Sequence, residues 1–307
     1  MSNMLIVYAI TLFSSAFLLF LIQPMAGKML LPLYGGTPAI WNACMVFFQA
    51  ALLFGYGYAH LSEKYLGSRR QSALHLLLML GGLLTLPLAF NSTALPPADN
   101  DPTIFLLYQL TLRIGLPFFI VSSSAPILQR WFSQTDHPDA EDPYFLYAAS
   151  NFGSLLALLG YPLLVEPSLS LDAQSRGWSM GYIVLIAMVS ACRLWLVSRR
   201  KTATAADRET AAVAPAAVPS PALRRQLFWL FCAFIPSSLM LGTTTFITTN
   251  LAAIPLLWVL PLALYLTTFI LVFARKQWLP HALLVRLMPF AAIAFAPFFS
   301  CPPACPS

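Results

Sequence analysis

Apolar residues fill long, nearly unbroken stretches of this chain, and short polar segments separate them. A helix needs about 20 such residues to cross the hydrocarbon core of a bilayer. These stretches are too long and too uniformly apolar for barrel strands, and helices satisfy their own backbone hydrogen bonds in lipid. We therefore expect an all-α polytopic membrane protein of about nine transmembrane helices, over residues 4–22, 39–60, 72–90, 103–126, 144–165, 178–197, 226–243, 253–274 and 282–300.

One long interruption separates six of these spans from the other three. Residues 198–225 begin with a basic run, continue through Ala, Thr and Pro, and end on two arginines. Such a composition is typical of a flexible linker. We expect a six-helix membrane half over 1–197, a basic, Ala- and Pro-rich cytoplasmic linker over 198–225, and a three-helix partial second half over 226–307.

The composition agrees with the apolar pattern. Of the 307 residues, 59% are hydrophobic and only 9% are charged, whereas soluble domains carry about 25% charged residues. This excludes a soluble globular enzyme and leaves little length for a separate water-soluble domain. No Lys or Arg precedes the first stretch, which is therefore an uncleaved first span and not a signal peptide.

The positions of the cations predict the orientation. If the loops alternate and the N-terminus lies inside, 14 of the 17 Lys and Arg residues fall on the inner side. Only Lys28 and Arg176 fall outside, and Arg113 lies within a span. The positive-inside rule then predicts a multi-pass membrane protein with a cytoplasmic N-terminus. The basic residues are spread over several loops, which excludes a nucleic-acid-binding face and leaves the bilayer as the main partner.

Arg113 is the most informative single residue. It lies ten residues into its span, about 15 Å deep, where an unpaired cation costs at least about 2.5 to 3.5 kcal/mol. Gln109 precedes it by one turn, and Pro117 follows at i+4, where it frees the carbonyl of Arg113. A carboxylate from the rim, of which Glu166 is the nearest, an anionic ligand group or backbone carbonyls would each complete the site.

Other polar residues within the spans are candidates for the same site. Most side chains of this kind form hydrogen bonds between helices, and the Thr-rich run 243–250 fits that role. As substrate-binding candidates we list, with Arg113 and Gln109, the residues Gln23, Asn42, Gln49 and Asn151.

The loop between the second and third spans, residues 57–70, resembles the inner loop motif of major facilitator transporters. Glu63 stands for the usual Asp, Ala59 occupies the first glycine position, and extra residues flank Gly67. The resemblance implies a conformational charge network at the ends of neighbouring helices, formed by Glu63, Lys64, Arg69 and Arg70. The alternative is a short basic loop that obeys the positive-inside rule.

Catalytic and metal-binding motifs are absent from the sequence. It contains no phosphate-binding glycine-lysine loop, nucleophile elbow or His-Glu-x-x-His zinc site. The acidic loop 136–142 matches no ordered ligand spacing, and no pair of histidines within the spans could hold a haem. The five cysteines form no disulfide framework. We expect no cofactor and no metal in this chain, and its own sequence carries no catalytic motif.

Three runs carry a family resemblance: residues 15–25 with their continuation to Asn42, residues 142–154, and residues 254–266. They resemble the major-facilitator-like membrane half of bacterial fused proteins that also carry a spermidine-synthase-like domain. The resemblance implies a location in a bacterial inner membrane. It also implies a transporter-like core that binds or passes a small solute, a polyamine or a related metabolite, at a central site. The alternative is a membrane anchor for an aminopropyltransferase domain that these 307 residues do not contain.

The C-terminal end of the sequence adds one further expectation. Nine spans that start inside leave Ser307 on the outer face, whereas an aminopropyltransferase domain needs cytoplasmic substrates. We therefore expect these residues to belong to a longer, fused protein and the last three spans to pack less completely than the first six.

Overall fold

The computed structural model describes residues 2–35, 38–90, 102–135, 137–140, 143, 145–199, 221–250, 259–273 and 280–300. Every regular element in these ranges is helical, which confirms the all-α fold class. The contacts divide the chain into two compact units, unit 1 over Met1–Val218 and unit 2 over Pro219–Ser307. Each unit is described separately. Of the predicted linker, residues 200–220 lie outside the described part.

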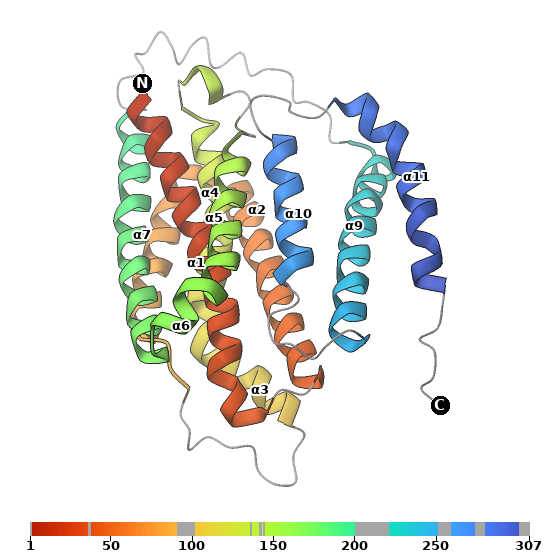
Figure 1. Cartoon of the computed structure of the whole chain (residues 1–307). Coiled ribbons are helices and arrows are strands. Elements are labelled where there is room, and N and C mark those ends of the chain that lie inside the picture. The colour runs from red at the N-terminus through yellow and green to blue at the C-terminus, as the bar shows by residue number, and fades with distance from the viewer. Residues whose placement is uncertain are drawn as a thin grey trace. The chain divides into compact units, whose positions relative to one another are not determined.

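Unit 1 is a bundle of long helices that run up and down beside one another (Figure 1). Short 3₁₀ and π-helical segments, labelled η, connect or interrupt the α-helices. In chain order the elements are α1 (Ser2–Tyr34), α2 (Pro38–Gly82), η1 (Leu83–Thr85), α3 (Pro102–Leu110), η2 (Thr111–Gly115), α4 (Leu116–Phe132), η3 (Pro138–Ala140), α5 (Phe145–Gly160), η4 (Tyr161–Val165), α6 (Glu166–Ser168) and α7 (Leu171–Arg199).

The 45-residue helix α2 consists of two arms that reverse direction at Gly67. This residue has φ 68° and ψ 160°, a backbone conformation that is essentially restricted to glycine. The Gln71 side chain donates to the carbonyl of Ala59 over 2.8 Å, although 12 positions along a straight helix would span about 18 Å. The chain therefore folds back on itself, and α2 contributes two of the predicted spans.

Two π-helical segments widen the bundle helices at prolines. Segment η2 links α3 to α4 and contains Arg113, and Pro117 follows it by two residues. Segment η4 links α5 to α6 and contains Pro162. Proline lacks the backbone N–H that donates the hydrogen bond of an α-helical turn. Single π-helical turns inside α-helices are frequent at functional sites.

Helix α1 lies at the centre of unit 1, in contact with α4, α5 and α7. The helices approach closely at small residues: a Cβ atom on Gly153 would lie 2.4 Å from the carbonyl oxygen of Phe13. Side-chain donors also join different helices, since Trp178 donates to the Leu18 carbonyl over 2.9 Å and Tyr182 to the Met79 carbonyl over 3.0 Å. Close packing at small residues and hydrogen bonds between helices are how membrane bundles are held together.

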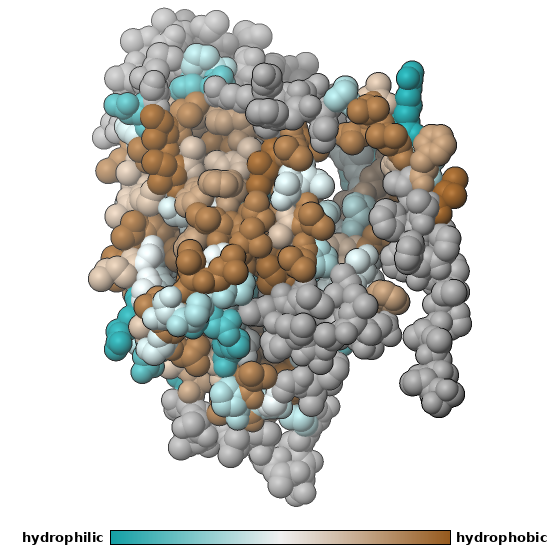
Figure 2. All heavy atoms as spheres, in the orientation of Figure 1, coloured by the Kyte–Doolittle hydropathy of each residue, from teal (hydrophilic) through white to brown (hydrophobic). Residues whose placement is uncertain are grey.

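Six helical segments of the described chain are long and apolar enough to cross a membrane. They are Asn3–Tyr34, Ile40–Thr85, Pro102–Phe132, Phe145–Ser168, Leu171–Val197 and Leu223–Thr244. Figure 2 shows apolar residues covering the middle of unit 1 on the face in view, with hydrophilic ones towards its ends. The chain is therefore a multi-pass helical membrane protein. The expected total of nine spans is not established by these six segments.

Unit 2 contains α9 (Leu223–Asn250), α10 (Val259–Phe273) and α11 (His281–Ser300). Helix α10 contacts α9, and Val259, Ala263 and Leu266 are buried on one face of it. Helix α9 is exposed along nearly all of its described side chains.

Candidate functional site

Arg113 lies in the π-helical segment η2, within the candidate span Pro102–Phe132. Its side chain is partly exposed, but its Nε atom is shielded from solvent and has no hydrogen-bond partner. No ion pair joins Arg113 to a carboxylate in the part of the chain that the structure describes. Among the described residues, the guanidinium therefore has no carboxylate partner within this candidate span.

Glu166, the carboxylate nearest to Arg113 by the sequence analysis, pairs with another cation. It forms an ion pair with Lys28 of α1, and both side chains are 29% exposed. Of the three ways to complete the Arg113 site, a carboxylate from the rim is thus not found among the described residues. The backbone of the π segment and an external anionic group remain.

The other predicted binding residues fall into two sets. Gln109 and Gln23 are buried, at 6% and 8% exposure. Asn42 and Gln49 are exposed and seven residues apart, so they lie on the same face of the first arm of α2. Asn151 is partly exposed and donates to the Tyr147 carbonyl of its own helix over 2.8 Å. Within the described part of the chain, no hydrogen bond joins members of these sets to one another or to Arg113.

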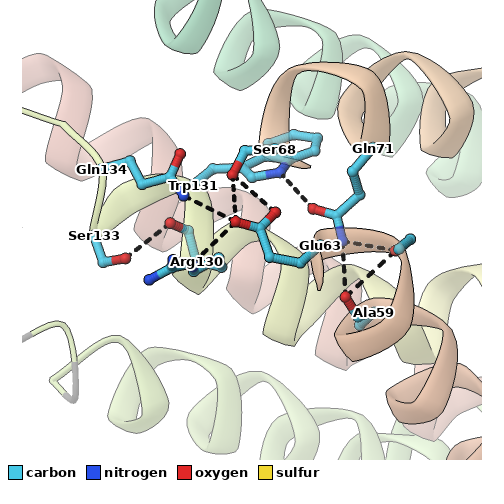
Figure 3. Close-up of polar contacts among 9 residues, drawn as sticks. Ala59, Glu63, Ser68, Gln71, Arg130, Trp131, Ser133 and Gln134 are labelled. Carbon is cyan, nitrogen blue, oxygen red and sulfur yellow. Dashed lines mark hydrogen bonds and ion pairs between the residues drawn. The ribbon is translucent and has the colours of Figure 1, made fainter. Parts of the chain in front are cut away.

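A polar network surrounds Glu63 at the end of unit 1 where α2 reverses (Figure 3). Its Oε1 atom accepts hydrogen bonds from Ser68 over 2.7 Å, from Arg130 Nε over 3.1 Å and from Gln134 over 3.0 Å. Ser68 lies 2.8 Å from Oε2 as well. The Glu63 carboxylate thus connects both arms of α2 to the end of α4.

A second set of buried polar groups continues this network inwards. Gln71 donates to Ser62 over 2.8 Å and accepts from the indole of Trp131 over 3.2 Å. His75 lies one turn further, fully buried, with its Nε2 atom 3.1 Å from Ser124. These residues were not among the sequence-based candidates, because a single Gln, Trp or His gives no periodic signal without its partner.

The three cations predicted to join the Glu63 network, Lys64, Arg69 and Arg70, form no ion pair with Glu63. Lys64 lies over the ring of its neighbour Tyr65, 5.4 Å from the centroid. Arg69 and Arg70 line a pocket beside Gly67 and form no ion pair with Glu63. The cation on Glu63 is Arg130, which the sequence analysis counted only as a residue of an inner loop. The two residues are 67 positions apart in the sequence, which hides this pairing from motif reading.

The acidic loop shows no cation site among its described residues. The ring of His137 lies tilted against that of Phe132, with centroids 5.6 Å apart, and the Asp139 amide donates to His137 Nδ1 over 3.2 Å. Asp136, Glu141 and Asp142 lie outside the described residues. No group of three or more His, Cys, Asp or Glu residues that could hold a metal occurs in the described chain.

Comparisons with models of protein families, with curated protein sequences and with solved structures find no match. They identify no family, so the resemblance to fused spermidine-synthase-like proteins stays a hypothesis. Any inference about function therefore depends on the geometry of the regions around Arg113 and Glu63.

Proposed function

We propose that this membrane protein binds or passes a small solute, and that Arg113 receives an anionic group of that solute. The observation that carries the proposal is the shielded, unpartnered Nε of Arg113 within a membrane-spanning segment. An arginine left unpaired there is unfavourable, so intramembrane arginines mark substrate or ion pathways unless they are paired. Glu166, the rim carboxylate that the sequence analysis placed nearest to Arg113, is held by Lys28.

Arg113 also narrows the class of solute. A polyamine carries several positive charges, which a neighbouring guanidinium would repel. A carboxylate or phosphate fits the planar fork of donors that arginine presents. Of the polyamine-related metabolites that the resemblance implies, we therefore favour those with a carboxylate or phosphate group. Gln109, one turn away and buried, supplies a neutral donor and acceptor.

The Glu63 network fits a conformational role in the same process. Glu63 is 20% exposed and Arg130 is 57% exposed, and ion pairs as exposed as this contribute at most about 1 kcal/mol. Contacts of this strength can break and re-form at ordinary temperature. We propose that the pairing of Glu63 with Arg130 is made in one state and lost in another, in which the α2 reversal separates from the end of α4.

The proposal is tested by solute binding to the purified full chain in nanodiscs. The probes are small amino acids, phosphate esters and the polyamines spermidine and putrescine, and the matched variants are Arg113→Gln and Arg176→Gln. We expect an anionic solute to bind wild type and Arg176→Gln and to lose at least about tenfold in affinity with Arg113→Gln, as expected for a lost charge-assisted bond. Arg176 is exposed and forms no part of the site.

The anchor hypothesis makes the opposite prediction. If these helices only hold an aminopropyltransferase domain at the membrane, no solute of any class binds, and Arg113→Gln changes stability alone. Tight binding of spermidine by Arg113→Gln and wild type alike would also contradict the role of Arg113.

We also propose how the protein is oriented in the membrane. Lys64, Arg130 and Arg193 lie near the Gly67 reversal or its Glu63 network, whereas Lys28 pairs with Glu166 at the far end of α1. We propose that the end with the arginines faces the cytoplasm of a bacterial cell. Reporter fusions at Ala211 test this: periplasmic activity at that point would overturn the orientation.

A further inference from the structure

An open pocket of about 540 Å³ lies beside the α2 reversal and plays no part in the proposed solute site. Arg69 and Arg70 enter it from the second arm of α2, and Arg193 enters it from α7. We propose that this pocket binds the phosphate of an anionic phospholipid headgroup.

The part of the chain that the structure describes supplies no counter-charge to this pocket. No ion pair joins any of the three arginines to a carboxylate among the described residues. Glu63, the nearest acid in sequence, is taken by Arg130, Gln134 and Ser68. The Nε atom of Arg193 is shielded from solvent and unpartnered. Three guanidinium groups around one cavity fit a phosphate, whose oxygens accept paired N–H donors.

The backbone adds to the positive potential. Ser68, also in the pocket wall, is the first residue of the second arm of α2 after the Gly67 kink. The beginning of a helix carries partial positive charge. This contribution is secondary to that of the arginines, but it has the same sign.

The apolar part of the pocket distinguishes a lipid from a free phosphate. Leu66 and Ala73 are exposed and share the pocket wall with the arginines. One turn beyond Ala73, Leu77 is 65% exposed, and Leu194, next to Arg193, is 63% exposed. Acyl chains could lie along these side chains while the phosphate contacts the arginines. Basic pockets between helices at a membrane surface bind lipid headgroups in this manner.

The experiment measures lipid retention by the full chain in detergent. Short-chain phosphatidylglycerol and phosphatidylcholine are titrated, and bound lipids are counted by native mass spectrometry. We expect wild type to bind phosphatidylglycerol in preference to phosphatidylcholine, and Arg193→Gln to weaken that binding about tenfold. Arg193→Lys should retain part of the affinity, and Arg224→Gln, which removes an exposed cation of unit 2, should retain all of it.

A competition experiment distinguishes a phospholipid from a soluble phosphate compound as the ligand of the pocket. Glycerol 3-phosphate and inorganic phosphate are added as competitors, and the proposal expects neither to displace the lipid at concentrations equal to it. Equal competition would assign the pocket to soluble phosphate esters and overturn the lipid. Equal binding of both lipids, or unchanged binding in Arg193→Gln and in the double variant Arg69→Gln/Arg70→Gln, would overturn the pocket itself. Thermal unfolding of each variant verifies that the compared proteins are folded.

Discussion

Units 1 and 2 both contain long apolar helices, but the two units differ in the share of each helix that is buried against other helices. The candidate span of α9 in unit 2 has a mean hydropathy of 1.6, against 1.5 for Phe145–Ser168 in unit 1. None of the α9 window is buried, whereas 28% of the Phe145–Ser168 window is. Lipid tails are as apolar as leucine, so hydropathy places a helix in the membrane and does not decide what it packs against.

The difference lies in small residues and in polar groups that reach across helices. In unit 1, Gly55, Gly153 and Gly181 each face another helix so closely that an added Cβ would collide with it. Gly242 of α9 has open space around it. The side-chain hydrogen bonds of Ser237 and Thr267 in unit 2 go to carbonyls of their own helices, whereas Ser15 of α1 reaches the Val121 carbonyl of α4. The expectation of looser packing after residue 226 is met by the described residues of α9.

The largest effect should come from a methyl group placed in the α1–α5 contact. Gly153→Ala should destabilise the protein by about 2 to 3 kcal/mol, because its Cβ must displace the backbone of α1 at Phe13. Gly242→Ala is the matched control and should be neutral or stabilising by about 0.5 to 1 kcal/mol. Thermal unfolding in detergent measures both variants. Equal effects at the two positions would remove the distinction between the units.

The α2 reversal should be the next most sensitive position. Gly67→Ala introduces a side chain at φ 68° and ψ 160°, which costs about 1 to 3 kcal/mol. Gly57→Ala, in the first arm with open space around it, should not destabilise. The two free energies of unfolding are compared in the same detergent. A Gly67→Ala protein as stable as wild type would show that the two arms do not need this backbone conformation.

The coupling between Glu63 and Arg130 should be smaller. A double-mutant cycle with Glu63→Gln and Arg130→Gln should give a coupling free energy of at most about 1 kcal/mol, because both groups are partly exposed. Raising the salt concentration should reduce it further. A coupling free energy several times larger would argue against a contact that breaks during a conformational cycle.

The smallest effect should come from unit 2. Arg225 lies over the ring of Trp229, 5.2 Å from its centroid, and both side chains are exposed. Arg225→Gln should therefore change the free energy of unfolding by only about 0.5 kcal/mol. A larger loss of stability would mean that Arg225 has partners that its exposure does not suggest.

The sequence alone determined the membrane class, the helical fold and most of the span positions. Runs of about 20 apolar residues admit no other backbone structure in lipid, so α1, α7 and the two arms of α2 could be anticipated from composition and length. Pro117 also marked a place where a helix departs from regular geometry, and the reversal at Gly67 falls in the loop expected between the second and third spans. The unusual character of Arg113 followed from one cation at about 15 Å depth.

The partners of the polar residues were decided only by the tertiary structure. Glu166 was one of the alternatives for completing the Arg113 site, and it binds Lys28. Glu63 was grouped with its sequence neighbours and binds Arg130, 67 positions away. Apolar periodicity reports which face of a helix avoids water, but in a bilayer nearly every face is apolar and the rotation of each helix stays undetermined. Helix contacts such as that of Gly153 with Phe13 determine this rotation, and with it the neighbours of each buried charge.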